Sequence, residues 1–501
     1  MNNNRFYGDC GEHLIWRFNP DDGTLIITGY GAMDDRKYVD YPWNSYRKKI
    51  QHVTFPDGLT RISNHAFEDC TNLAYVTFPD SLTSIGENAF EGCSMKSVTF
   101  PEGLTSIGEK AFYICEKLMY VTFPESLTEI GKHVFERCKE LIEITFPNSL
   151  TSIGESAFAG CELLEKVTFP EGLTSIGNYA FCGCKALESV TFPESLTEIG
   201  DAAFSGIVCL TAFSIAPSNP NFSTKDGVLF NKEGTKLIKY PSGRIGAYAV
   251  PAGVTSIGDH AFGGCDGLIF VSIPDSVTSI GDYAFNSCEG LASVSLPARL
   301  TSIGERVFEY CSNLMEITFP EGLTEIGDHA FDSCTSLTKI SLPDRVTKIG
   351  ICAFYGCEGL TQIVLPDRIT FIGEDAFGEC PGLTQVKLPE GLTEIRGYVF
   401  EGCEGLKEII LPKGLTSIGR YAFDSCISLT SITFPKGLTS IDRYAFFVCE
   451  GLTQVTLPDG LISIGERAFW GCKGLSDVVI PASVTEIGEY ALDFEGRSPS
   501  L

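Results

Sequence analysis

Apolar and polar residues along this chain follow one pattern that returns about every 23 residues. One copy reads VTFPDSLTSIGENAFEGC, from Val76 to Cys93, with apolar side chains at fixed places. The proline of each copy marks the spacing, and it identifies 18 copies between Pro56 and Pro481. A fixed period of this length is the signature of a solenoid, in which small coils stack along one axis.

Each copy predicts a short strand followed by a turn. The segment LAYVTF, from Leu73 to Phe78, has an alternating character with Leu73, Val76 and Phe78 apolar, and Val and Thr favour strands. Pro79 lacks a backbone donor and ends the strand. Gly86 follows the next isoleucine, and a glycine stands there in nearly every copy, which predicts a turn that needs a positive φ.

The second half of each copy predicts the closure of the coil and a column of stacked rings. Ala89, Phe90 and Cys93 have a spacing that suits one helical turn. The phenylalanine recurs from Phe67 to Phe469, so the rings are expected to stack along the core at the spacing of strands.

Two stretches break the pattern, and they divide the chain. Residues 1–50 carry a predicted strand hairpin with two of the three tryptophans, and a terminal cap must cover the first coil. Between Pro193 and Pro251 the chain has turn signals around a predicted hairpin at Lys232-Glu233-Gly234. We therefore predict one continuous domain with four parts: cap 1–50, solenoid block 51–206, irregular repeat with hairpin insertion 207–250, and second solenoid block 251–501.

Charge and composition narrow the classes of partner and the location. The net charge of −27 disfavours nucleic acid and anionic membrane surfaces, and it suits either solubility or a basic partner. No stretch approaches 18 apolar residues, so we predict no membrane insertion. The opening residues show no basic start and apolar run of a secretory leader, so the chain is cytosolic or has lost its leader.

The 20 cysteines do not predict a disulfide framework. Seventeen, counting Cys209, are assigned to one place in the repeat, and Cys10, Cys182 and Cys352 are the others. A buried column of free thiols is expected, because cysteine packs as a small apolar residue.

Catalytic and metal-binding constellations are not evident. Four of the six histidines (His65, His133, His260 and His329) share one repeat position, two residues before the phenylalanine. They lie coils apart and are not expected to converge on a metal or a nucleophile. We predict no catalytic residue, no metal site and no cofactor; the alternative of an enzyme requires a polar pocket near residues 216–245.

The position two residues before the phenylalanine is the most informative, because it varies while the core positions do not. Tyrosine stands there at the candidate binding residues Tyr179, Tyr283, Tyr398, Tyr421 and Tyr444. Three successive coils carry the last three. Aromatic residues in an exposed row are typical anchors for a protein partner, and the alternative is that they cover neighbouring apolar surface.

Two further columns are interpreted as structural. The middle residue of the strand is Thr or Ser in 13 of 18 copies, which suits the outward face of a sheet. The residue after the proline is acidic in 12 of 18 copies, which suits a solvated turn.

The recurrent phrase AFxxCxxLxxVxFPxxLTxIG resembles the BspA-like leucine-rich repeats of bacterial and some protist surface proteins. GDCGEHLIW with DGTLIITGYGAM is similar to the cap of many members, and NPNFSTKDGVLFNKEGTKLIKYP to a common interruption. The resemblance implies a right-handed solenoid with short parallel strands on its concave side, and turns and short helical turns elsewhere. It also implies adhesion through bound host matrix proteins, and it offers no catalytic motif.

We therefore predict a non-enzymatic protein-binding solenoid for adhesion, or for recognition of host or matrix proteins, at a cell surface. The expected ligand is a protein, such as an extracellular-matrix or serum protein. The alternative is an intracellular scaffold, located in the cytoplasm, or a secreted effector, which would use the same surface to bind other proteins.

Overall fold

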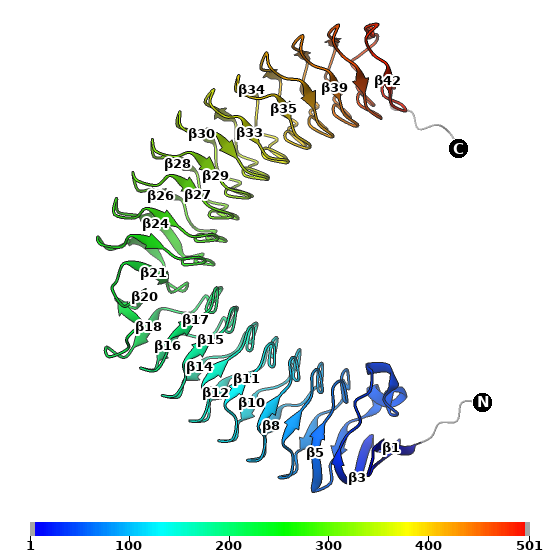
Figure 1. The fold of residues 1–501 in the computed structure, drawn as a ribbon, viewed down its shortest axis with the longest axis vertical. Coiled ribbons are helices and arrows are strands. Elements are labelled where there is room, and N and C mark those ends of the chain that lie inside the picture. Colours follow the sequence, from blue (N-terminus) through cyan, green and yellow to red (C-terminus); the bar gives the residue numbers. More distant parts are fainter. Residues whose placement is uncertain (1–5, 496–501) are drawn as a thin grey trace, which may run out of the picture. The chain divides into compact units, whose positions relative to one another are not determined.

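The computed structural model describes residues 6–495, and the chain divides into two compact units, residues 1–244 and 245–501 (Figure 1). Within its described residues, each unit is a stack of short coils built from parallel strands. The helices among the described residues are two short 3-10 helices, η1 (Tyr38–Asp40) and η2 (Asn44–Lys49).

The first unit begins with an antiparallel sheet. Its strands are β1 (Tyr7–Gly11), β2 (Leu14–Asn19) and β3 (Thr24–Ala32), and β2 pairs with both neighbours. β3 then pairs in parallel with β4 (His52–Thr54) and with β5 (Gly58–Ile62), the two strands of the first coil. One long strand thus supplies the hydrogen-bonding edge for both strands of that coil.

Trp43 joins this first segment to the core of the coils. Its ring stacks on Phe67 with centroids 5.5 Å apart and an interplanar angle of 11°. Its indole N–H donates to the carbonyl oxygen of Ala66 at 2.7 Å, and its side chain is fully buried. A tryptophan therefore continues the column of phenylalanine rings.

Each further coil of the first unit contributes a long strand, and all but the last also contribute a two-residue strand. The two kinds of strand form two separate columns. The long strands are β6 (Tyr75–Thr77), β8 (Ser97–Thr99), β10 (Tyr120–Thr122), β12 (Glu143–Thr145), β14 (Lys166–Thr168), β16 (Ser189–Phe192) and β18 (Ala212–Ile215). The short strands are β7 (Ser84–Ile85), β9 (Ser106–Ile107), β11 (Glu129–Ile130), β13 (Ser152–Ile153), β15 (Ser175–Ile176) and β17 (Glu198–Ile199).

The second unit repeats this arrangement. Its long strands are β22 (Gly246–Ala249), β24 (Leu268–Ser272), β26 (Ser293–Ser295), β28 (Glu316–Thr318), β30 (Lys339–Ser341), β32 (Gln362–Val364), β34 (Gln385–Lys387), β36 (Glu408–Ile410), β38 (Ser431–Thr433) and β40 (Gln454–Thr456). Its short strands are β23 (Ser256–Ile257), β25 (Ser279–Ile280), β27 (Ser302–Ile303), β29 (Glu325–Ile326), β31 (Lys348–Ile349), β33 (Phe371–Ile372), β35 (Glu394–Ile395), β37 (Ser417–Ile418), β39 (Ser440–Ile441), β41 (Ser463–Ile464) and β42 (Glu486–Ile487).

Equivalent residues of successive coils lie beside each other. β10 pairs in parallel with β12, so that Val121 stands opposite Ile144 and Thr122 opposite Thr145. The hydroxyl of Thr151 likewise donates to the carbonyl oxygen of Thr128, its equivalent one coil earlier, at 3.0 Å. This register confirms the predicted solenoid of parallel strands.

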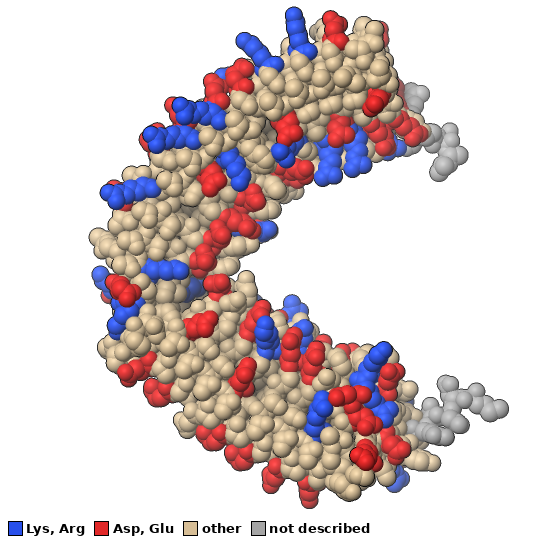
Figure 2. Space-filling model, viewed as in Figure 1, with Lys and Arg blue, Asp and Glu red and all other residues tan. Residues whose placement is uncertain are grey.

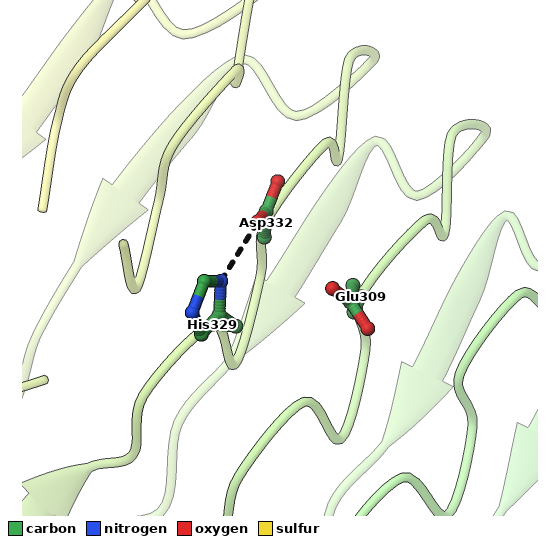
Figure 3. Close-up of side chains that lie close together, drawn as sticks. All are labelled: Glu309, His329 and Asp332. Carbon is green, nitrogen blue, oxygen red and sulfur yellow. Dashed lines mark hydrogen bonds and ion pairs between the residues drawn. The ribbon is translucent and has the colours of Figure 1, made fainter. Parts of the chain in front are cut away.

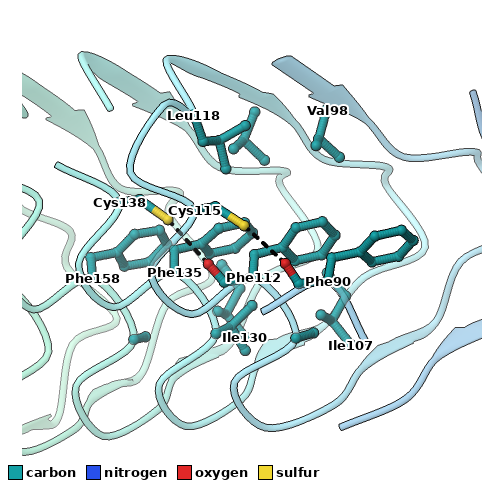
Figure 4. Close-up of a cluster of buried hydrophobic side chains, with 14 of the residues drawn as sticks. Phe90, Val98, Ile107, Phe112, Cys115, Leu118, Ile130, Phe135, Cys138 and Phe158 are labelled. Atoms are coloured by element: carbon teal, nitrogen blue, oxygen red, sulfur yellow. Dashed lines mark hydrogen bonds between the residues drawn. The ribbon is translucent and has the colours of Figure 1, made fainter. Parts of the chain in front are cut away.

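The core is a column of phenylalanine rings with a column of thiols beside it (Figure 4). Phe90, Phe112 and Phe135 stack with centroids 5.3 and 5.5 Å apart. Most thiols of the column donate to a phenylalanine carbonyl of the preceding coil, as Cys115 does to Phe90 at 3.1 Å. Burial raises the pKa of the Cys115 thiol to about 12, so this thiol is inert at neutral pH.

The segment around the phenylalanine is not an α-helical turn. The N–H groups of Asn88, Phe90 and Gly92 donate to carbonyl oxygens of the following coil at 2.8–3.0 Å, while those of Glu91 and Cys93 donate within the turn. Asn88 and Gly92 have φ of 52° and 70°. These left-handed residues interrupt a right-handed helix, because they turn every second amide toward the next coil.

Gly86 corrects a second expectation. It does not lie in the left-handed region, whereas Asn88 two residues later does. A Cβ on Gly86 would stand 2.5 Å from the amide nitrogen of Asn64 and 2.6 Å from the carbonyl carbon of Ser63. Glycine is therefore required here because the backbone of the preceding coil passes too close for a side chain.

The interruption of the repeat in the first unit is an antiparallel meander of β19 (Phe222–Lys225), β20 (Val228–Asn231) and β21 (Lys236–Lys239). β19 and β20 are joined by Asp226 and Gly227, both left-handed, as a two-residue hairpin requires.

Asn219 fastens this meander to the preceding coil. Its side chain is fully buried, and its amide donates to the carbonyl oxygens of Glu194 and Leu196 at 3.0 and 2.9 Å. The assignment of Cys209 to the thiol column is wrong: Cys209 is exposed, and the buried Ile207 occupies the column, three residues after Phe204.

Candidate functional site

The position two residues before the core phenylalanine, or before Leu492 in the last coil, has the same backbone in all 18 coils. Its φ lies between 50° and 61°, the left-handed region that favours glycine. No coil has glycine there, whereas the equally left-handed position two residues after the phenylalanine is glycine in eight coils. The chain therefore keeps a side chain at the first position although the backbone would be less strained without one.

Three of the predicted tyrosines form a single stack, called here the tyrosine ridge (Tyr398, Tyr421 and Tyr444). The centroids of Tyr398 and Tyr421 are 4.9 Å apart and those of Tyr421 and Tyr444 are 4.6 Å apart, with an interplanar angle of 5° in both pairs. The three residues are half-buried, because the faces of the rings cover each other.

Arginines extend the ridge. The guanidinium of Arg420 lies 5.2 Å from the ring centroid of Tyr398, and that of Arg467 lies 5.7 Å from Tyr444 and 5.4 Å from Tyr490. Arg467 also donates to the hydroxyl of Tyr444 at 2.7 Å. Such cation–π contacts hold the guanidinium groups in place, and both tyrosine and arginine are enriched at binding hot spots.

The other two predicted tyrosines do not join the ridge. Tyr283 stacks on His260 with centroids 4.7 Å apart, and its hydroxyl donates to Glu305 at 3.1 Å. Tyr179 belongs to the first unit, where 41% of it is exposed. Of the five candidate residues, the structure brings together the three from successive coils.

A groove runs beside the ridge along the short strands β35, β37, β39, β41 and β42. We call it the short-strand groove; its volume is about 830 Å³, and its lining includes Gly397 and Arg420, the residues directly before Tyr398 and Tyr421. Its lining also includes Ser417, Ser440, Ser463 and Arg396. An ion pair at 2.6 Å joins Arg396 to Glu394. The groove is polar and carries both signs of charge, as Figure 2 shows for much of the visible surface.

Carboxylates accumulate behind the ridge. Burial raises the pKa of Glu401 to about 7, and the nearby charges of Asp424, Asp375 and Glu379 raise it further. The pKa of Asp375 is raised to about 6, first by burial and then by Glu374. This part of the molecule would gain from a cationic group placed among the carboxylates.

Sequence reasoning missed a second aromatic pair next to the ridge. Phe447 and Trp470 stack with centroids 4.7 Å apart, and the ring of Phe447 lies 5.4 Å from that of Tyr444. Both follow directly after the core phenylalanine, where many other coils have an acidic residue. That change of residue type was the signal that could have revealed them.

One cluster has the residue types of a metal site: Glu309, His329 and Asp332 (Figure 3). The sequence argument asked only whether histidines of different coils come together. It did not consider a carboxylate of the neighbouring coil, such as Glu309. Among residues 6–495, no helix is long and apolar enough to cross a membrane.

Comparison with known proteins identifies the repeat. Five overlapping segments match the family model of a BspA type leucine rich repeat region, and these segments are residues 44–163, 151–250, 240–357, 324–446 and 370–497. This match confirms the resemblance inferred from the recurrent phrase. No curated protein matches the chain.

Solved structures of bacterial leucine-rich repeat proteins are similar to this chain. A leucine rich cell surface protein from Faecalibacterium prausnitzii is 31% identical, with a TM-score of 0.56 over 75% of this chain and 97% of its own. A leucine-rich repeat protein from Bacteroides ovatus is 26% identical over 76% of this chain and 94% of its own, with a TM-score of 0.39.

Proposed function

Because this chain belongs to the BspA-type leucine-rich repeat family, we propose that it is a non-enzymatic recognition protein of a cell surface that binds a protein ligand. Repeat solenoids present extended surfaces on which partners bind, and their near-identical coils do not converge on a catalytic centre. The similar chain from Faecalibacterium prausnitzii is described as a cell surface protein, which supports the location. We propose adhesion to an extracellular-matrix or serum protein as the role.

The observation that carries this proposal is the tyrosine ridge along the short-strand groove. Tyr398, Tyr421 and Tyr444 are ordered by stacking before any partner arrives, so binding would cost little side-chain entropy. Arg420 and Arg467 add donors for carboxylates or carbonyl groups of a ligand. An extended segment of a protein partner fits the open, polar groove better than a small apolar molecule does.

The test is saturable binding of the purified chain to a panel of extracellular-matrix and serum proteins, measured across a salt series. A triple variant, Tyr398→Ala with Tyr421→Ala and Tyr444→Ala, should lose at least tenfold in affinity, because it removes the aromatic anchors. A matched control replaces the exposed Ile410, Thr433 and Thr456 with alanine in the long strands of the same late region. This control should bind as the natural chain does.

Other results would change the proposal in defined ways. Equal binding by the ridge variant and the natural chain would exclude the ridge as the contact surface. Loss of binding in the control alone would move the site to the long strands. No saturable binding to any panel member would contradict the adhesive role and favour a scaffold or effector whose partner is inside a cell.

A further inference from the structure

Three ionisable side chains from two successive coils of the second unit converge outside the tyrosine ridge. Glu309 directly follows the core Phe308, Asp332 directly follows Phe331 one coil later, and His329 precedes Phe331 by two residues. One nitrogen or oxygen atom of each side chain lies within 4.8 Å of the other two (Figure 3). Among the described residues, this is the one group of three such side chains that comes so close.

We propose that Glu309, His329 and Asp332 bind a divalent transition-metal ion of the Zn²⁺ type. One imidazole and two carboxylates are ligands that such ions accept, with water completing the coordination. Ligand atoms about 2.1 Å from a tetrahedral ion stand about 3.4 Å apart, so the three side chains need to approach by at most about 1.4 Å. Ca²⁺ is disfavoured, because it takes six to eight oxygen ligands.

Burial distinguishes this cluster from surface carboxylates. Glu309 is 3% exposed and Asp332 is 8% exposed, yet both carry carboxylates that face each other across adjacent coils. Two buried carboxylates this close repel each other, and burial weakens the screening by water. A bound divalent cation would neutralise both charges.

The hydrogen bonds of the cluster leave room for an ion. Glu309 accepts one hydrogen bond at each oxygen, from Arg306 at 2.8 Å and Asn286 at 2.7 Å, and each carboxylate oxygen has a second lone pair. Asp332 interacts with Nδ1 of His329 at 2.9 Å and accepts from Ser333 at 2.8 Å. Asn286 and Ser333 thus orient the carboxylates, as outer partners do for metal ligands.

Arg306 is the competitor of the ion, because its positive charge already faces Glu309. It has a second partner, since its Nε lies 3.3 Å from a carboxylate oxygen of Glu305. Replacing Arg306 should therefore strengthen metal binding. This expectation makes the proposal testable by a gain of affinity, which a misfolded protein would not produce.

The chain supplies its own matched control. His133 and Glu136 form the same pair, two before and one after a core phenylalanine, with Nδ1 and Oε2 2.5 Å apart. The places equivalent to Glu136 in the coils on either side hold Tyr113 and Ala159, so no second carboxylate joins the pair. A histidine–carboxylate pair alone should not retain the ion.

The experiment is calorimetric titration of the untagged full chain with Zn²⁺, repeated with Co²⁺ while its absorption spectrum is recorded. We expect one ion per chain, at least tenfold weaker binding in His329→Ala and in Glu309→Gln, and unchanged binding in His133→Ala. Arg306→Gln should bind at least several-fold more tightly. The Co²⁺ spectrum should show nitrogen and oxygen ligation without a thiolate charge-transfer band.

Two results would overturn the proposal. Absence of stoichiometric binding by the natural chain, or equal affinity in the natural chain and in both His329→Ala and Glu309→Gln, would show that these side chains hold no ion. A thiolate band would assign the ion to a cysteine such as the exposed Cys209 instead. Circular dichroism of each variant would verify that a loss of binding is not a loss of fold.

Discussion

The coils of Arg306 and His329 and the coils of the tyrosine ridge have the same backbone but opposite chemistry beside the core. In the first region a basic side chain two residues before the phenylalanine reaches a carboxylate one residue after it, as Arg306 reaches Glu309. In the ridge, Tyr398 and Tyr421 take the places of these basic residues, while Glu401 and Asp424 keep the places of the carboxylates.

The difference teaches that the framework and the surface of this solenoid are specified separately. The rings of Phe308 and Phe331 stack at 5.2 Å and those of Phe400 and Phe423 at 5.5 Å, although the side chains above them differ completely. Basic residues and tyrosines at the left-handed position are therefore compatible with the same core stacking. Coils with one framework thus carry different surface chemistry.

The largest loss of stability is expected from removing one core phenylalanine ring in either region. Phe331→Ala and Phe400→Ala should each lower the free energy of unfolding by about 3–5 kcal/mol, because both rings are fully buried between two others. Hydrogen exchange measures the loss locally, since long repeat arrays do not unfold in one step. A clearly smaller cost in one region would contradict the common framework.

Breaking the charge pairing should have a smaller effect, confined to the first region. Arg306→Gln leaves the buried Glu309 with Asn286 as its donor. The free energy of unfolding should fall by about 1–3 kcal/mol. Zn²⁺ should restore this stability if the proposed metal site exists. The control is Arg467→Gln at the end of the ridge, where the ion-pair partner Glu466 is exposed. This variant should scarcely change the unfolding midpoint in urea.

Interrupting the tyrosine ridge should lower the stability by less than breaking the charge pair does. Tyr421→Ala removes the middle ring and two stacking contacts, with an expected loss of about 1 kcal/mol in the coils of the ridge. Tyr421→Phe keeps the ring, and its stability should remain close to that of the natural chain. Equal stability of the alanine and phenylalanine variants would show that the stack contributes nothing to the fold.

The smallest effect concerns pH, because Glu401 is only partly buried. Its pKa of about 7 lies above the ordinary 4.5, so its contribution to stability is full below about pH 4.5 and is lost as pH rises through 7. Glu401→Gln should reduce the fall of the thermal midpoint between pH 5 and pH 8. The control is Glu408→Gln in strand β36. This variant should show the same fall of the thermal midpoint between pH 5 and pH 8 as the natural chain.

The sequence predicted the features that depend on one repeat position alone. The period determines that equivalent residues stack, so the ring column and the contact of Tyr398 with Tyr421 follow from spacing. Features that depend on contacts between different repeat positions of neighbouring coils were not predicted, such as the approach of Glu309 to His329. The reason why residue 86 is glycine was not predicted either, because its close neighbour Asn64 belongs to another coil.

The in-register ladders have a consequence for the gene. Because a backbone group or hydroxyl of one coil bonds to its counterpart one coil away, as Thr151 does to Thr128, an in-frame gain or loss of one 23-residue coil rejoins equivalent partners. Recombination events that add or remove whole repeats would then lengthen or shorten the protein by whole coils. The number of coils could drift between strains while each variant still folds.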